Sequence, residues 1–125
     1  VPTAIGARLD QDNEQLRFGK GYDHNWIIDK TIEGVEQIAS VYEPTLGRYM
    51  EVWSDQPGLQ FYGGNFFNGK VKDKYGKPMR FREAIALETQ KFPDSPNHPD
   101  FPTNSLNPGE VYVHTCIYKF MTKNE

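Results

Sequence analysis

Apolar and polar residues alternate in several short stretches of this chain, which is the pattern of β-strands with one buried face. Pro44 and the turn Thr45-Leu46-Gly47 separate two of these stretches, so we expect the two to form a hairpin. A short helix is predicted around Asp12 to Arg17, with Asp12 or Asn13 as its N-cap. The predicted strands lie within residues 22–29, 36–43, 48–54, 58–62, 84–90 and 110–121.

The predicted strand 110–121, the longest of the set, carries apolar side chains on both faces. One face holds Val111, Val113 and Ile117, and the other holds Tyr112, Cys116, Tyr118 and Phe120. Both faces need cover, as in a strand that is central to two layers, and about six strands supply little of it. We therefore expect an all-β fold, an antiparallel β-sandwich or a part of one.

Composition and charge narrow the class of protein. The chain has 125 residues, enough for one domain, with 37% hydrophobic residues, eleven glycines and nine prolines, as in a loop-rich β protein. The net charge is −3 and the charges are interspersed, so we expect no nucleic-acid partner. No apolar run approaches 18 residues, so no membrane span is expected.

The single cysteine, Cys116, excludes an intrachain disulfide and a multi-cysteine metal site. It lies in an apolar strand pattern, and we expect a buried thiol. The sequence starts at Val1 without a methionine or a signal-peptide pattern, which fits either processing or a piece of a longer protein. We expect the cytoplasm as its compartment, with export left open.

Glu88 is the first candidate for chemistry. In the strand 84–90, Ile85, Leu87 and Thr89 point one way, and Glu88 shares the other face with two alanines and an amide, which leaves room for a ligand. A stiff, proline-rich loop follows directly. A carboxylate near the end of a strand, beside such a loop, suits a general base; a solvated surface glutamate is the alternative.

Two further strands carry candidates for sugar binding. Asp23, in the run Asp23-His24-Asn25, lies at the mouth of a short strand, where polar groups are well placed for binding, although they could also bond their own backbone in a turn. Gln60 shares a strand face with Tyr62. An amide that donates and accepts matches a hydroxyl, and a ring covers C–H surface; an ordinary polar face is the alternative.

Other catalytic classes lack their motifs. His98 lies in a loop and His114 in the last predicted strand, without the helical spacing of a zinc protease, so we expect no metal. Gly63-Gly64 precedes no helix, so a phosphate cradle is not indicated. No nucleophile motif for a serine or cysteine triad is present.

Three strings, in this order and spacing, closely resemble the carboxy-terminal part of the aldose 1-epimerases, the galactose mutarotases. The closing Asn107-Pro108-Gly109-Glu110 is also similar, so the resemblance covers nearly the whole chain. The strings are Gly21-Tyr22-Asp23-His24-Asn25-Trp26, Gln56-Pro57-Gly58-Leu59-Gln60-Phe61-Tyr62-Gly63-Gly64-Asn65, and Leu87-Glu88-Thr89-Gln90-Lys91-Phe92-Pro93-Asp94-Ser95-Pro96-Asn97.

The resemblance implies that residues 1–125 are the carboxy-terminal portion of one aldose 1-epimerase domain, a large antiparallel β-supersandwich. It implies that Glu88 is the general base, and that Asp23 and Gln60 contact the sugar. The family's histidine acid belongs to amino-terminal motifs that this sequence lacks. The implied reaction interconverts the α and β anomers of free aldohexoses of the galactose or glucose class, without a cofactor.

Other hypotheses for the function remain open, and the resemblance implies binding partners. A non-catalytic carbohydrate-binding β module, a structural β domain of a larger assembly, and a sugar-phosphate epimerase are the alternatives. The expected partners are a monosaccharide and the missing amino-terminal part of the same protein. Self-association is also expected, because about six strands cannot cover the aromatic side chains. The aromatic set comprises Trp26, Trp53, Tyr112, Tyr118 and Phe120.

Overall fold

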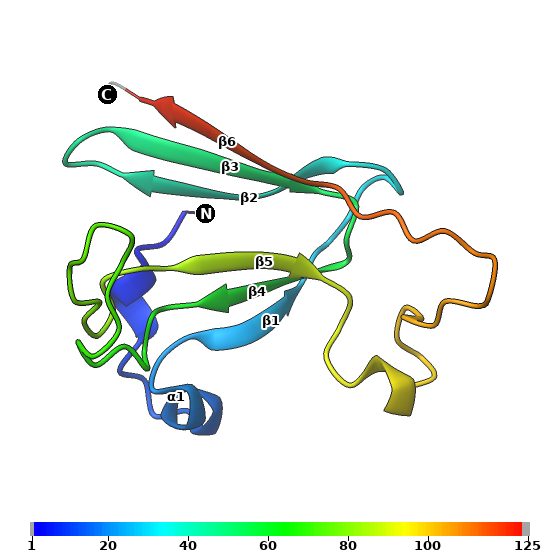
Figure 1. The fold of residues 1–125 in the computed structure, drawn as a ribbon, viewed down its shortest axis with the longest axis horizontal. Coiled ribbons are helices and arrows are strands. Elements are labelled where there is room, and N and C mark those ends of the chain that lie inside the picture. Colours follow the sequence, from blue (N-terminus) through cyan, green and yellow to red (C-terminus); the bar gives the residue numbers. More distant parts are fainter. Residues whose placement is uncertain (1, 124–125) are drawn as a thin grey trace. The chain divides into compact units, whose positions relative to one another are not determined.

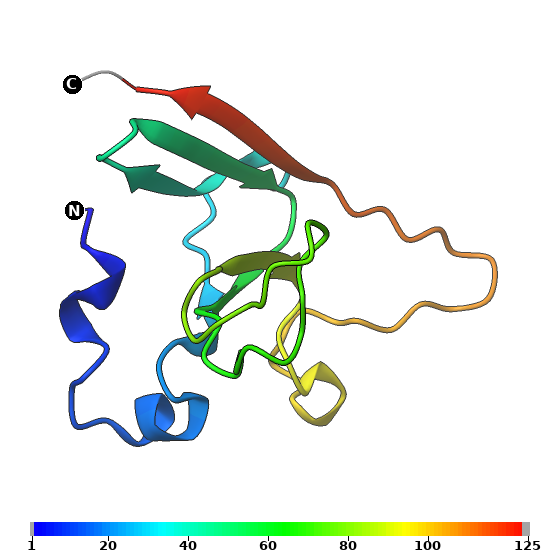
Figure 2. The ribbon, with the colours of Figure 1, turned by 60° about the vertical axis from the view of Figure 1, so that its left-hand side comes forward.

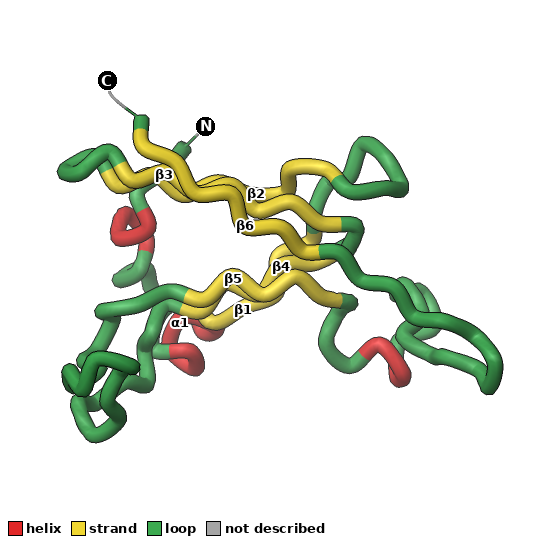
Figure 3. The backbone as a smooth tube through the Cα atoms, turned by 45° about the horizontal axis from the view of Figure 1, so that its top comes forward, coloured by secondary structure: helices red, strands yellow, loops and turns green. Residues whose placement is uncertain are grey.

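Six short strands form two three-stranded antiparallel sheets, with the orders β1-β4-β5 and β2-β3-β6 (Figure 1). The computed structural model describes residues 2–123. Helix is limited to short turns, and loops connect all the elements (Figure 3). The elements are η1 (Ile5–Arg8), α1 (Glu14–Gly19), β1 (Asp23–Ile27), β2 (Glu36–Glu43), β3 (Arg48–Ser54), β4 (Gly58–Tyr62), β5 (Ala86–Gln90), η2 (Ser95–Asn97) and β6 (Cys116–Thr122).

The chain divides into two compact units. One unit comprises the residues up to Trp26 together with Gln60–Glu88, and the other comprises Ile27–Leu59 together with the residues from Thr89 onward. The first unit contains α1, and the second contains the whole sheet β2-β3-β6. No helix among residues 2–123 has the length and apolar character needed to cross a membrane.

Helix α1 begins where the sequence predicts a cap. The side chain of Asn13 accepts hydrogen bonds from the backbone N–H groups of Gln15 at 2.9 Å and Leu16 at 3.4 Å, which satisfies two of the free donors of the first turn. The helix ends at Gly19, and Lys20 follows in the left-handed conformation. The predicted helix and its Asn13 cap are confirmed, with the helix displaced two residues toward the carboxyl end.

Strands β2 and β3 form the predicted hairpin with the predicted bounds. Their register runs from Glu36 opposite Ser54 to Glu43 opposite Arg48. Gly47, in the turn, has φ +67, and a Cβ there would collide with the carbonyl oxygen of Lys123. The carbonyl of Gly47 accepts from the N–H of Lys123 at 2.7 Å, so this turn also holds the chain just after β6.

Strand β6 is shorter than predicted and lies at an edge. It begins at Cys116 rather than Glu110, because its partner β3 ends at Ser54, which is opposite Cys116. The residues before it run as a loop (Figure 2), so β2, with eight residues, is the longest strand. Within residues 2–123, β6 pairs only with β3 and lies at the edge of its sheet. The expectation that both of its faces are covered, as in a strand central to two layers, stays a prediction. Cys116 is exposed at this edge strand, so the predicted buried thiol is wrong.

Large aromatic side chains remain uncovered, as the sequence indicates. Trp26, Tyr112, Tyr118 and Phe120 are exposed, and Phe120 retains 75% of its surface. Trp53 is half-buried. Self-association through such surfaces stays a prediction.

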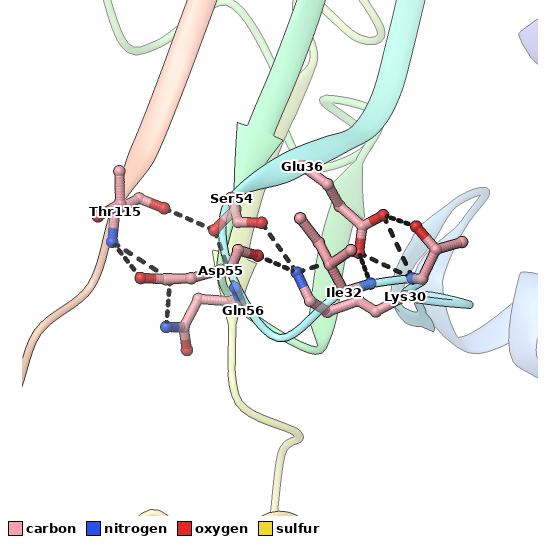
Figure 4. A network of polar contacts seen from close by, with 9 residues as sticks. Lys30, Ile32, Glu36, Ser54, Asp55, Gln56 and Thr115 are labelled. Carbon is pink, nitrogen blue, oxygen red and sulfur yellow. Dashed lines mark hydrogen bonds and ion pairs between the residues drawn. The ribbon is translucent and has the colours of Figure 1, made fainter.

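A polar network fixes the end of β3 (Figure 4). The hydroxyl of Ser54 donates to the carbonyl of Thr115 at 2.7 Å, and the carboxylate of Asp55 accepts from the N–H of Thr115 at 3.1 and 3.2 Å. The side chain of Gln56 donates to Asp55 at 2.7 Å. Both backbone groups of Thr115 are therefore bound by side chains, immediately before β6 begins.

The same network reaches the start of β2. The ammonium of Lys30 donates to the carbonyl of Ser54 at 3.1 Å and to that of Gly34 at 2.8 Å, and it lies 3.4 Å from the carboxylate of Glu36 (Figure 4). Glu36 in turn accepts from the hydroxyl of Thr31 at 2.6 Å. These contacts connect the loop before β2 to the carboxyl end of β3.

The charge on Asp55 contributes to stability. Burial raises the pKa of Asp55, but hydrogen bonds from the Gln56 side chain and the Thr115 backbone, together with the nearby charge of His114, outweigh burial and lower the pKa below its ordinary value of 3.8. A carboxylate with a lowered pKa stabilises the fold above its unfolded pKa. That contribution is lost as the pH falls through the folded value.

We predict that Asp55→Ala lowers the free energy of unfolding at pH 7 by about 1–2 kcal/mol, because the N–H of Thr115 loses its acceptor. The difference from the unaltered chain should shrink as the pH falls below the ordinary value of 3.8 and through the lowered pKa of folded Asp55, where the carboxylate becomes protonated. Urea unfolding followed by tryptophan fluorescence at pH 7 and pH 3 measures both effects. Asp100→Ala, at an exposed position, is the control and should change stability by less than about 0.5 kcal/mol. Equal stability of the Asp55 variant and the unaltered chain at pH 7 would contradict the assignment.

Candidate functional site

Two of the three predicted site residues are joined by a hydrogen bond. Asp23 begins β1 and Gln60 lies in the middle of β4, the neighbouring strand in the sheet. The side-chain amide of Gln60 donates from Nε2 to Oδ1 of Asp23 at 2.8 Å. The amide is thereby oriented, and the carboxylate retains a second oxygen that can accept from a hydroxyl.

The backbone next to Asp23 is held by the Gly63-Gly64-Asn65 string. The carbonyl of Tyr22 accepts from the side-chain amide of Asn65 at 2.8 Å and from the N–H of Gly63 at 2.9 Å. Gly21 has φ +131, and a Cβ there would lie 2.7 Å from Oδ1 of Asn65, so only glycine fits. Residues 43 positions apart thus act together to position Asp23.

His24 links the start of β1 to α1. Its Nδ1 accepts from the N–H of Asp23 at 3.1 Å, and its Nε2 lies 3.2 Å from the carbonyl of Gln15. With Nδ1 as the acceptor, Nε2 carries the proton and donates to Gln15. The ring therefore acts as a support for Asp23.

Tyr62, which shares a strand face with Gln60, contacts the loop after β4. Its hydroxyl accepts from the N–H of Phe66 at 3.0 Å, and its ring stacks on that of Phe66 with centroids 6.3 Å apart. Phe67 meets the same ring edge-on at 5.9 Å. These contacts fix the loop that carries the chain away from the Asp23–Gln60 pair.

Glu88 lies in β5, the strand beside β4, and is exposed. Its neighbours Leu87 and Thr89 are buried, as is Leu59 next to Gln60. Because side chains alternate along a strand, we infer that Glu88 and Gln60 share the face opposite the buried residues. Asp23 and Gln60 are brought together directly, whereas Glu88 is related to them by its place on the adjacent strand.

The loop after β5 is held by its own side chains. Asp94 has φ +60, and its carboxylate accepts from the amide of Asn97 at 2.5 Å and lies 3.1 Å from Nε2 of His98. The ring of His98 stacks on Phe101 with centroids 4.6 Å apart. His98 therefore has a structural partner on each side. Within residues 2–123, no group of three or more His, Cys, Asp or Glu side chains is arranged to hold a metal ion.

His114 lies before β6 rather than in a strand, and sequence reasoning missed its contact. Its Nε2 lies 2.7 Å from the hydroxyl of Thr89, the residue after Glu88. Asp55, which binds the backbone of Thr115, was likewise not predicted as a functional residue. The contacts join residues 25 and 60 positions apart, so no local spacing in the sequence signals them.

Comparison with known proteins identifies the family expected from the motifs. The family model described as aldose 1-epimerase matches residues 2–119. Galactose mutarotase of Rattus norvegicus is 43% identical over 132 residues, which cover 96% of this chain and 38% of the relative. Aldose 1-epimerase of Escherichia coli K12 is 34% identical over 121 residues, which cover 95% of this chain and 34% of the relative.

A solved structure supports the fold. The crystal structure of a GalM/aldose epimerase homologue from C. elegans matches with a TM-score of 0.65 at 24% identity, over 82% of this chain and 30% of that chain. The chain spans 38% or less of the length of these curated relatives. The match of the family model over residues 2–119 shows that the chain belongs to the aldose 1-epimerase family.

Proposed function

We propose that this chain is the carboxy-terminal portion of an aldose 1-epimerase that interconverts the α and β anomers of free aldohexoses such as galactose or glucose. Glu88 is the general base, and Asp23 and Gln60 bind sugar hydroxyls. The histidine that acts as general acid belongs to the preceding part of the protein. The monosaccharide and that preceding part are the partners of this chain.

The observation that carries the proposal is the Asp23–Gln60 pair beside the strand of Glu88. A carboxylate that accepts and an amide that both donates and accepts are complementary to vicinal hydroxyls. Their hydrogen bond of 2.8 Å fixes the two groups before a ligand arrives, so little ordering is needed on binding. Membership of the aldose 1-epimerase family, shown by the family model, supplies the reaction class.

Ring opening requires one proton to leave the sugar and one to arrive. The carboxylate of Glu88 removes the proton from the anomeric O1 hydroxyl, and the electrons of that O–H bond form the C1=O1 carbonyl as the C1–O5 bond breaks. The acid gives its proton to the ring oxygen O5. Each proton transfer by a positioned group contributes about 10²–10⁴-fold to the rate.

Ring closure reverses these transfers on the other face of the carbonyl. The aldehyde turns about the C1–C2 bond, the O5 hydroxyl adds to C1, and its proton returns to the acid. Glu88 returns its proton to O1, so both groups regain their starting states. No electrons leave the sugar, so the chemistry requires no redox cofactor. Asp23 and Gln60 hold hydroxyls that do not react, which keeps C1 over Glu88 while the open chain turns.

We predict that Glu88→Gln in the complete protein lowers kcat by at least about 10²-fold and changes KM modestly. Glutamine keeps the size of glutamate but cannot accept the O1 proton at neutral pH. Polarimetry of α-galactose equilibration measures the rate. Glu33→Gln, the same change at an exposed residue of the loop before β2, is the control and should keep full activity. Near-normal turnover of the Glu88 variant would exclude Glu88 as the base, and retained binding without any catalysis by the unaltered protein would favour a carbohydrate-binding module.

We predict a different kinetic pattern for Asp23→Asn. A charge-assisted hydrogen bond to a sugar hydroxyl contributes about 1.5–3 kcal/mol, and its loss should raise KM as well as lower kcat/KM by that amount. The same polarimetric assay over a range of sugar concentrations separates the two constants. An Asp23→Asn protein with an unchanged KM would show that Asp23 does not bind the substrate.

We predict that the 125-residue chain by itself does not accelerate mutarotation, because it supplies the base without the acid. Polarimetry of the purified chain, beside the complete protein at equal molarity, tests this. Clear acceleration above buffer by the chain alone, with no co-purified fragment, would show that the acid lies within these residues.

A further inference from the structure

The side chains of Thr89 and His114 make a contact that the proposed chemistry does not use. The hydroxyl of Thr89 and Nε2 of His114 are hydrogen-bonded at 2.7 Å, with the donor set by the tautomer of the ring. Thr89 is 8% exposed, so its hydroxyl is shielded from water and depends on this partner. His114 is exposed, and the ring of Tyr112 meets it edge-on with centroids 6.1 Å apart.

His114 is held in place through its neighbour Thr115. The hydroxyl of Ser54 binds the carbonyl of Thr115, and the carboxylate of Asp55 binds its N–H (Figure 4). Ser54 is fully buried, so this anchor belongs to the most protected part of the chain. The loop that carries His114 is therefore fixed at Thr115, the residue after the histidine. His114 itself belongs to no strand.

The hydrogen bond of His114 reaches β5 through the side chain of Thr89. In the sheet order β1-β4-β5, β5 follows β4 at one end. The side-chain bond at Thr89 adds a restraint to this strand from the loop before β6. Thr89 directly follows Glu88, and adjacent side chains of a strand point to opposite faces, so the restraint acts on the backbone that carries the carboxylate without approaching the carboxylate itself.

A nucleophilic role for the same residues is excluded by burial. Threonine, histidine and aspartate also occur together in hydrolytic sites, where the hydroxyl must reach a substrate carbonyl. The hydroxyl of Thr89 lies on the buried face of β5. The carboxylate of Asp55 is bound to the N–H of Thr115 and the amide of Gln56, rather than offered to the ring by a hydrogen bond.

We propose that His114 is a positioning residue for mutarotation, which restrains the backbone next to Glu88 through its hydrogen bond to Thr89. This inference rests on the proposed function, in which Glu88 is the base. Loss of the bond removes this restraint from the backbone that carries Glu88. A base that is displaced by a fraction of an ångström loses rate while the sugar, held by Asp23 and Gln60, still binds.

The test uses the complete protein and the polarimetric assay, with kcat and KM determined separately. Thr89→Val keeps the shape of the side chain and removes the hydroxyl, and His114→Ala removes the ring. Each should lower kcat about tenfold and change KM less than about twofold. Thr89→Ser keeps the hydroxyl and should restore kcat to within about twofold of the unaltered protein. The double variant should be no slower than the slower single variant, because both changes break one bond.

Matched controls and a stability measurement separate positioning from folding. Thr122→Val, at an exposed position of β6, and His98→Ala, in the loop after β5, should keep kcat. Thermal unfolding of each variant gives the folded fraction by which kcat is corrected. If Thr89→Val and His114→Ala lower the melting temperature but keep kcat per folded molecule, the positioning role is overturned. Additive losses in the double variant, or a failure of Thr89→Ser to restore kcat, would also overturn it.

The outcome for this inference is distinguishable from that for the proposed function. If the unaltered protein does not accelerate mutarotation, or if Glu88→Gln keeps full turnover, the proposed function fails. If the unaltered protein is active and depends on Glu88, but Thr89→Val keeps kcat, only the role of His114 fails. Thr89→Val decides the question alone if His114→Ala does not fold, because valine fills the same buried space.

Discussion

The hydrogen bonds from Ser54 and Asp55 to the backbone of Thr115 are the constraint that sets where the sheet β2-β3-β6 ends. They bind both backbone polar groups of one residue, immediately before β6 begins. The sheet ladder therefore ends at the pair Ser54–Cys116, and the chain leaves β3 to begin β4 only four residues later, at Gly58. Burial of Asp55 is outweighed by hydrogen bonds from Gln56 and Thr115 that favour the charged carboxylate and lower its pKa, so its contribution to this junction is lost as the pH falls below the ordinary value of 3.8.

A second set of contacts prepares the candidate site. The carbonyl of Tyr22 is bound by Asn65 and Gly63, which places Asp23 at the start of β1, within reach of Gln60 on β4. Glycine at position 21 is required because a side chain there would meet Asn65. Two of the three strings that resemble the aldose 1-epimerase family thus build one polar pair, in addition to carrying its side chains. This explains in physical terms why glycines and an asparagine recur beside the sugar-binding candidates.

Local sequence patterns predicted the features that neighbouring residues determine, namely strand bounds and the helix cap. The bounds of β2, β3 and β4 follow from alternation ended by turn residues, and the cap at Asn13 follows from its side chain. The start of β6 could not be predicted, because alternation continues back to Glu110 while the partner strand stops at Ser54. The exposure of Cys116 follows from the position of β6 at the edge of its sheet. In the site, strand alternation correctly predicted an exposed Glu88 between buried residues, and the family resemblance singled out Asp23 and Gln60. The Thr89–His114 bond stayed hidden because it joins a strand to a distant loop.

The central claim is that Glu88 removes the anomeric proton while Asp23 and Gln60 hold the sugar. A crystal structure of the complete protein with galactose bound tests it most directly, since it shows all three side chains and the reacting atom together. The account predicts the Glu88 carboxylate within about 2.6–3.2 Å of the anomeric O1. It also predicts hydrogen bonds from other sugar hydroxyls to Asp23 and Gln60. Galactose bound away from β1, β4 and β5, or bound there with O1 out of reach of Glu88, would contradict the account.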